Sequence, residues 1–233
     1  MSSPLPEILS NLRKAAAAVG HPPPVLLAVS KTRPAEAVAA LAAQGQRAFG
    51  ENYVQEGLAK IQALRSLALE WHLVGHLQTN KAEAVAQHFD WVQSVDRAKL
   101  VAALGRHRSP EQPPLNVLIQ VNIDDEDSKH GCAPGELPAL ADAVAAQPRL
   151  ALRGLMAIPA PWPESARRRA AFARMHALFK ALADVHPQVD TLSMGMSDDY
   201  ADAIAEGATM VRIGTALFGA RPAGPVQRRE PTD

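Results

Sequence analysis

The sequence predicts a TIM-type (β/α)₈ barrel preceded by an extra N-terminal helix. Eight short apolar runs alternate with stretches of helical periodicity, and each run except the last is followed by such a stretch. The chain of 233 residues is also close in length to such barrels, which typically have about 250 residues. A doubly wound open sheet is the main alternative, but it usually carries a glycine fingerprint after its first strand, and here SKTRP occupies positions 30–34.

The first elements are predicted from the spacing of apolar residues and from the prolines and glycines at element ends. Residues 7–19 are rich in alanine, with Ile8 and Leu12 on one helical face, and three prolines at 22–24 end this helix. The continuously apolar run at 25–29 is typical of a strand buried on both faces, as in parallel sheets. Residues 34–44 have helical spacing, with Pro34 in the first turn and Gly45 just past the end.

The same alternation then repeats to the end of the chain. Further strands are predicted at 47–50, 71–75, 91–95, 115–123, 151–158, 191–196 and 210–218. Helices are predicted at 52–66, 80–88, 97–107, 134–147, 164–185 and 198–206. We therefore expect one barrel domain over residues 1–220, followed by a loose tail rich in Pro and Arg at 221–233.

Composition restricts the functional class. Hydrophobic residues make up 47% and charged residues 21% of the chain, which are ordinary globular values. The 24 basic and 24 acidic residues cancel, so the basic excess of a nucleic-acid-binding protein is missing. The sequence has no apolar stretch of membrane-spanning length and no signal peptide, and its single cysteine cannot form an internal disulfide. We expect a cytoplasmic protein without nucleic-acid or membrane partners.

Lys31 is the most informative residue for function. It stands at the end of the first apolar strand, on the rim where barrels carry their sites. Burial generally lowers the pKa of a lysine, and a neutral amine is a nucleophile that condenses with aldehydes. The alternative is a rim lysine that extends into solvent, and the strand alone leaves both interpretations open.

A phosphate site is predicted at the ends of strands seven and eight. Ser193 and Thr215 offer hydroxyl donors, Gly214 allows close backbone approach, and residues 215–217 can open a short helix. Arg212 lies two residues before Gly214 on the same strand face, where it either reaches the barrel mouth or forms a core ion pair. His72 and His76 stand four residues apart with no evident third ligand, so no zinc site is expected.

Ordered sequence blocks resemble the pyridoxal phosphate homeostasis proteins, a group similar to the barrel half of alanine racemase. The blocks are AVSKT at 28–32, FGENYVQE at 49–56, WHLVG at 71–75, NVLIQVN at 116–122, LMAI at 155–158, SMGMSDD at 193–199 and VRIGTALFG at 211–219. The resemblance implies that Lys31 holds pyridoxal 5′-phosphate (PLP) as an internal aldimine. It also implies that Ser193, Gly214 and Thr215 bind the phosphate, that Arg212 faces the pyridine nitrogen and that Asn52 lies near the ring.

The resemblance leaves an enzyme and a carrier as alternatives. Racemisation on this fold needs a second acid/base group, which racemases bring from a C-terminal domain, and the chain is expected to end with its barrel. Arg212 beside the pyridine nitrogen would also weaken the cofactor as an electron sink, but racemases of this fold accept the same arrangement, so the missing domain carries more weight. We therefore expect a monomeric PLP carrier without turnover, with PLP-dependent apoenzymes as its partners, and a weak PLP-dependent amino-acid racemase as the alternative.

Overall fold

The computed structural model describes residues 4–125 and 130–219. The tail predicted at 221–233 lies outside the described residues, so the domain boundary expected at residue 220 stays a prediction. Among the described residues, no helix is both long and apolar enough to cross a membrane.

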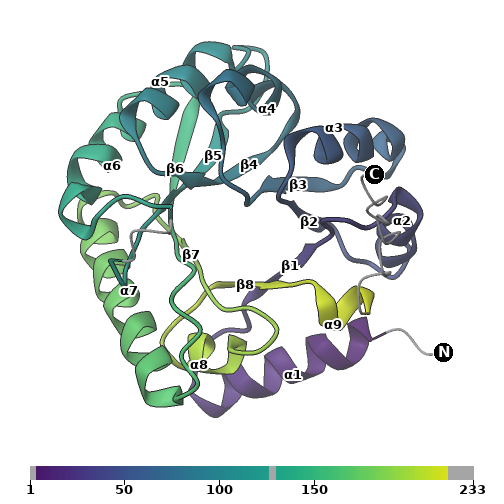
Figure 1. The fold of residues 1–233 in the computed structure, drawn as a ribbon, viewed down its shortest axis with the longest axis vertical. Helices are drawn as coiled ribbons and strands as arrows, with labels where there is room; N and C mark the ends of the chain where they lie inside the picture. Colours follow the sequence, from purple (N-terminus) through teal and green to yellow (C-terminus); the bar gives the residue numbers. More distant parts are fainter. Residues whose placement is uncertain (1–3, 126–129, 220–233) are drawn as a thin grey trace, which may run out of the picture.

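The described strands form a closed barrel, as predicted, and Figure 1 looks down its axis. All neighbouring strands are parallel and adjacent in sequence, and β1 pairs with β8 to close the ring. The strands are β1 (Val25–Val29), β2 (Ala48–Glu51), β3 (Glu70–Leu73), β4 (Trp91–Val95), β5 (Leu115–Gln120), β6 (Leu150–Met156), β7 (Thr191–Ser193) and β8 (Met210–Ile213).

Helices surround the barrel, and the extra N-terminal helix α1 lies beside α8 and α9 (Figure 1). The α-helices are α1 (Leu5–Ala18), α2 (Ala35–Ala42), α3 (Val54–Ala63), α4 (Ala82–His88), α5 (Ala98–His107), α6 (Leu137–Ala145), α7 (Ser165–Val185), α8 (Tyr200–Ala205) and α9 (Thr215–Phe218). Short 3₁₀ helices lie at η1 (Arg65–Leu67), η2 (Thr79–Lys81) and η3 (Pro134–Glu136). The main core lies between the strands and these helices.

Five strands end earlier than predicted: β3 and β6 by two residues, and β5, β7 and β8 by three or more. The strand predicted over 210–218 ends at Ile213, and the apolar residues after Gly214 form α9 instead. Short apolar runs do not distinguish a strand from a helix, although Thr215 was expected as a helix start. The strand predicted over 191–196 ends at Ser193, since Gly195 adopts a φ of 91°. The strand predicted over 115–123 ends at Gln120.

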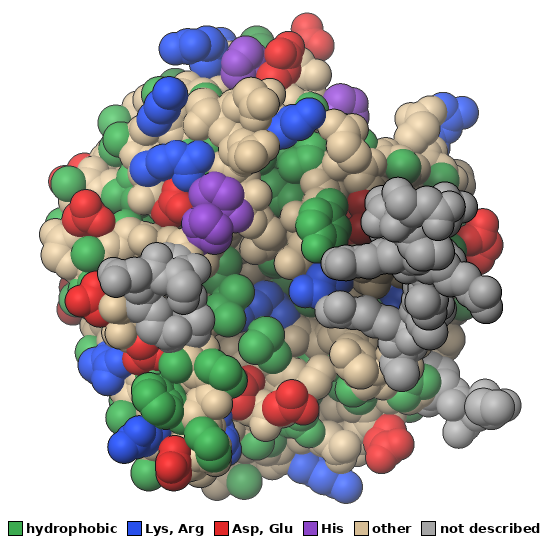
Figure 2. All heavy atoms as spheres, viewed as in Figure 1, with side chains coloured by type: hydrophobic (Ala, Val, Ile, Leu, Met, Phe, Trp, Pro, Cys, Tyr) green, Lys and Arg blue, Asp and Glu red, His purple; other side chains and the backbone are tan. Residues whose placement is uncertain are grey.

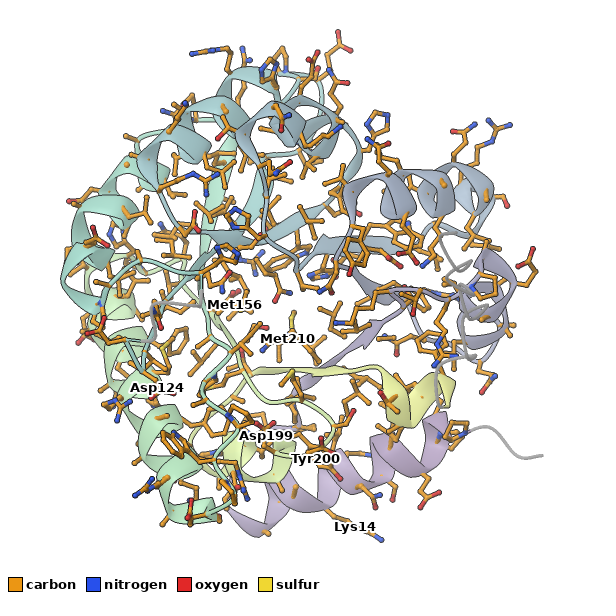
Figure 3. All side chains as sticks on the ribbon, viewed as in Figure 1. Lys14, Asp124, Met156, Asp199, Tyr200 and Met210 are labelled. Atoms are coloured by element: carbon orange, nitrogen blue, oxygen red, sulfur yellow. The ribbon has the colours of Figure 1, made fainter. Side chains whose placement is uncertain are left out.

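The barrel interior holds two apolar clusters and a set of buried polar side chains. Met210 belongs to one cluster and Met156 to the other, and Figure 3 labels both near the barrel centre. The clusters consist of Leu27, Ala48, Val74 and Met210, and of Trp91, Leu118 and Met156. The polar side chains among them connect the core to the site described next.

Candidate functional site

A cavity of about 330 Å³ opens at the carboxyl ends of the strands. This is the size range of small-ligand sites, about 300–1,000 Å³. Its lining residues are Val29, Lys31, Thr32, Arg33, Asn52, Val74, Ile158, Met196, Ser197, Asp198, Arg212, Gly214 and Thr215. Basic side chains lie in the hollow at the centre of the face in Figure 2. Three basic side chains against one acidic side chain in the lining favour an anionic ligand.

The register of β1 against β8 places Lys31 in this cavity. Leu27 pairs with Arg212, and both lie on the inner side of the barrel. Because side chains alternate along a strand, Val29 and then Lys31 follow Leu27 on the inner side. Val29 and Lys31 both line the cavity. Lys31 and Arg212 therefore line the same cavity.

The residues on both sides of Lys31 are fixed by a buried lysine, Lys60 of α3. Its Nζ donates hydrogen bonds to the carbonyl of Ser30 at 2.6 Å, to Oε1 of Glu51 at 2.6 Å and to Oε1 of Glu56 at 2.7 Å. Glu56 Oε1 also accepts the backbone N–H of Thr32 at 2.6 Å. This network, Lys60 with Glu51 and Glu56, therefore clamps the backbone immediately before and after Lys31.

Thr32 has a φ of 62°, an unusual conformation for a β-branched residue. Such backbone costs of order 1–3 kcal/mol and persists only where the surroundings impose it. The hydrogen bond from Thr32 N–H to Glu56 supplies that constraint. Strain next to Lys31 marks the rim of β1 as a positioned segment rather than an ordinary loop.

Glu51 is fully buried and carries the negative charge opposite Lys60. Burial raises the pKa of its carboxyl group, while the hydrogen bonds from Lys60 and Ser30 oppose this shift. Its Oε1 accepts from Ser30 Oγ at 2.5 Å, and its Oε2 is buried without a hydrogen-bond partner. The network is thus tightly packed around one oxygen and leaves the other unpaired.

Asn52 follows β2 and is held at the mouth by a close backbone contact. A Cβ atom on Gly75 would lie 2.0 Å from the carbonyl oxygen of Asn52. Only glycine at position 75 permits this approach between the ends of β2 and β3. Asn52, Gly214 and Thr215 all line the cavity, as the sequence predicted.

Arg212 lies on the floor of the cavity and is buried, with 4% of its surface exposed. Burial lowers the pKa of its guanidinium to about 10, and the charge of Asp199 opposes this shift. The group therefore stays protonated at neutral pH. It donates to Ser193 Oγ at 2.7 Å and to the carbonyl of Ala157 at 2.8 Å.

A chain of hydrogen bonds continues from Arg212 through the barrel. Ser193 Oγ donates to Gln93 Oε1 at 2.7 Å, and Gln93 Nε2 donates to His72 Nδ1 at 3.0 Å. His72 Nε2 lies 2.8 Å from Glu70 Oε1 at the other end of the barrel. Because arginine only donates and an ionised carboxylate only accepts, the chain has one direction, and His72 is the neutral Nε2–H tautomer.

Ser193 was expected at the phosphate, but it is not among the residues that line the cavity. Its side chain is fully buried, and its hydroxyl is engaged by Arg212 and Gln93 below the cavity. Since β7 ends at Ser193, this side chain points into the barrel, while Ser197 in the following turn lines the cavity. Sequence reasoning missed Ser197, although it belongs to the same SMGMSDD block, and also missed Lys60, Gln93 and His72.

Fold and site together define a TIM-type barrel whose mouth holds a lysine within a positively charged, hydroxyl-bearing cavity. Residues 4–222 match the family model described as "Alanine racemase, N-terminal domain". The chain belongs to this family, within its pyridoxal phosphate homeostasis proteins.

Relatives of this name come from several bacteria. The pyridoxal phosphate homeostasis protein of Pseudomonas aeruginosa is 55% identical over 220 residues, which cover 94% of each chain. That of Escherichia coli K12 is 53% identical over 222 residues, which cover 93% of this chain and 95% of the relative.

Solved structures agree with the fold. PipY of Synechococcus elongatus without PLP is 39% identical with a TM-score of 0.80, covering 89% of this chain and 100% of PipY. PipY with PLP bound has a TM-score of 0.75 at the same identity, covering 89% and 98%. Alanine racemase from Corynebacterium glutamicum shares the fold, with a TM-score of 0.65 and 22% identity, and the match covers 94% of this chain and 62% of the racemase.

Proposed function

We propose that this protein binds PLP at the barrel mouth through a covalent imine with Lys31 and serves PLP homeostasis without catalytic turnover. The observation that carries the proposal is a lysine at the end of β1 facing Gly214, Thr215 and Ser197 across one positively charged cavity. The names of the P. aeruginosa and E. coli relatives and the PLP-bound structure of PipY support it.

The residues present fit this cofactor. The Ser197 and Thr215 hydroxyls and the backbone at Gly214 suit the phosphate, since hydroxyls and free N–H groups bind anions. Lys31 would take the aldehyde carbon, with its backbone held by the Lys60 network. Arg212 would face the pyridine nitrogen, and Asn52 would lie beside the ring. Ser193 acts indirectly, by accepting a hydrogen bond from Arg212.

Two features of the cavity bear on the choice between a carrier and an enzyme, namely Arg212 and the acid/base groups of the lining. Bound PLP supplies an electron sink, which is strongest when the pyridine nitrogen is protonated. A guanidinium with a pKa of about 10 only donates hydrogen bonds at neutral pH, so it keeps a facing nitrogen unprotonated. Among the described lining residues, Asp198 is the only carboxylic acid and no His, Tyr or Cys side chain is present. Among the described lining residues, Asp198 is therefore the one candidate for the second acid/base group that racemisation needs.

A weak amino-acid racemase is the alternative, and Asp198 is the observation in its favour, as an acid at the cavity rim. The test combines two assays on the PLP-loaded full chain. We expect no racemisation of free L-amino acids above that of free PLP, and transfer of PLP to a PLP-dependent apoenzyme. If the unaltered protein racemises amino acids and Asp198→Asn loses this activity at unchanged PLP content, the protein is a racemase and the proposal of a carrier is wrong.

A further inference from the structure

Three side chains outside the cofactor cavity converge at the rim: His76, Asp96 and His130. One ligand atom from each lies within 4.8 Å of the others. His76 Nδ1 and Asp96 Oδ2 are 3.7 Å apart, too far for a hydrogen bond. Two ligands of a tetrahedral zinc ion, each about 2.0–2.1 Å from the metal, stand about 3.3 Å apart. A small closure would therefore bring these atoms to coordination distance.

We propose that His76, Asp96 and His130 form a binding site for a divalent transition-metal ion of the zinc type. The proposal rests on these three residues and their supports, not on the proposed PLP function. Two imidazoles and one carboxylate are a donor set that suits zinc, whereas magnesium and calcium require oxygen ligands. With three protein ligands, the fourth position remains for water or another small ligand.

Contacts with neighbouring elements hold the backbone around His76 in place. Ser94 Oγ donates to the carbonyl of Gly75 at 2.7 Å, and Arg97 Nη2 donates to the carbonyl of Leu77 at 2.9 Å. The two peptide carbonyls that flank His76 are therefore both fixed by the end of β4 and the start of α5. Such preorganisation lowers the cost of binding an ion.

Asp96 and His130 are supported in the same way. Arg97 Nη1 donates to Asp96 Oδ1 at 2.5 Å, which leaves Oδ2 on the side of His76. Gln120 Nε2 donates to the carbonyl of His130 at 3.0 Å. Partners of this kind orient metal ligands in known sites.

The imidazoles of His76 and His130 stack, with ring centroids 3.7 Å apart and planes at 14°. Partial burial and the neighbouring His130 lower the pKa of His76. The prediction of no zinc site paired His76 with His72, but His72 lies inside the barrel. The further histidine ligand, His130, follows β5, and no local spacing in the sequence relates it to His76 after β3.

An ion at this site would join three loops at the mouth. His76 follows Val74, which lines the cofactor cavity, and His130 precedes the bridge between Val121 and Cys132. Binding would therefore fix the loop after β5 against the ends of β3 and β4, beside the cavity. Cys132 is buried and is not among the three residues whose ligand atoms converge.

The test is a titration of the full chain, first stripped of metal with a chelator, with ZnCl₂. Binding is measured by calorimetry and by competition with a chromophoric chelator. We expect one equivalent of Zn²⁺ to bind, at least tenfold weaker binding in His76→Ala and in His130→Ala, and loss of the site in the double variant. His88→Ala removes an exposed histidine on α4 and should bind as the unaltered protein does, as should Cys132→Ser.

Two controls make every result decisive. Circular dichroism without zinc must match across the variants, so that lost binding reflects lost ligands. The titration is also run with and without PLP, because PLP itself binds metals. Absence of stoichiometric zinc binding in the unaltered chain would overturn the proposal. So would zinc binding that survives in the double variant, since the ion would then be held elsewhere or by the cofactor.

Discussion

Arg212 and Ser193 meet inside the barrel, where the arginine Nη1 donates to the serine hydroxyl over 2.7 Å. This contact joins the floor of the cavity to a one-way hydrogen-bond chain that ends at Glu70 on the opposite side of the barrel. It explains why Arg212 has a fixed orientation although it is buried: two of its five N–H donors are taken up by Ser193 and by the carbonyl of Ala157.

The first prediction concerns Arg212 itself. We expect Arg212→Gln to change the visible absorption of bound PLP more than it changes PLP retention, because the partner we propose for Arg212 is the ring nitrogen rather than the phosphate. Absorption spectra before and after dialysis measure both quantities. An unchanged spectrum in a folded Arg212→Gln protein would mean that Arg212 does not face the ring.

Gln93 tests the hydrogen-bond chain away from the cavity. Gln93→Leu leaves Ser193 Oγ and His72 Nδ1 without their partner, and each buried group left unpaired costs about 1–3 kcal/mol. Urea unfolding should show the lower free energy of unfolding, and the PLP spectrum should shift as Arg212 reorients. Gln87→Leu, on an exposed position of α4, is the matched control and should change neither.

Lys60 tests the clamp around Lys31. Lys60→Met removes the cation that pairs with buried Glu51, and breaking such a buried pair costs about 3–5 kcal/mol. We expect a matching loss in the free energy of unfolding and weaker PLP retention. Adding Glu51→Gln to Lys60→Met should restore part of the stability, since the unpaired charge is then gone. Lys99→Met, an exposed lysine on α5, should behave as the unaltered protein; equal losses in both single variants would refute the clamp.

The pH dependence of stability follows from His72. Burial lowers the pKa of His72 in the folded protein below its ordinary value of 6.5, despite the opposing effect of Glu70. Below pH 6.5 the unfolded chain binds a proton that the folded protein does not, so stability falls as the pH drops from 6.5 toward the lowered pKa. The slope from this group approaches about 1.4 kcal/mol per pH unit.

Unfolding free energies at pH 7.5 and 5.5 measure this effect. The decrease should be smaller in His72→Gln than in the unaltered protein, whereas the exposed His88→Gln should keep it in full. The variant difference isolates His72 from Glu51, whose raised pKa acts in the opposite sense. Equal pH dependence in all three proteins would show that His72 is not held neutral.

Residues whose position depends on where a strand ends could be predicted from the sequence. Residues whose position depends on side-chain packing could not. Lys31, Asn52, Arg212, Gly214 and Thr215 were placed together because all lie at or just after the carboxyl ends of parallel strands of one barrel. Ser193 was expected at the phosphate, but its hydroxyl is engaged by Arg212 and Gln93, whereas Ser197 in the turn after β7 lines the cavity. The sequence did not show that β7 ends between these two serines.

Lys60 shows a second limit. Its spacing of four from Glu56 is the pattern of an exposed helix ion pair, and the sequence does not reveal that α3 turns this pair inward under Ser30. His76 and His130 show a third, since they meet through loops from different strands. Long-range contacts of this kind have no local sequence pattern.

The most direct test of the account is peptide mapping of the PLP-loaded full chain after borohydride reduction. We predict that the pyridoxyl mass falls on the peptide containing Lys31, and that Lys31→Ala abolishes the label while keeping its fold and some dialysable PLP held through Ser197 and Thr215. Lys81→Ala, at the end of η2, should remain fully labelled. A label on Lys81 or any other lysine, or undiminished labelling of Lys31→Ala, would contradict the account.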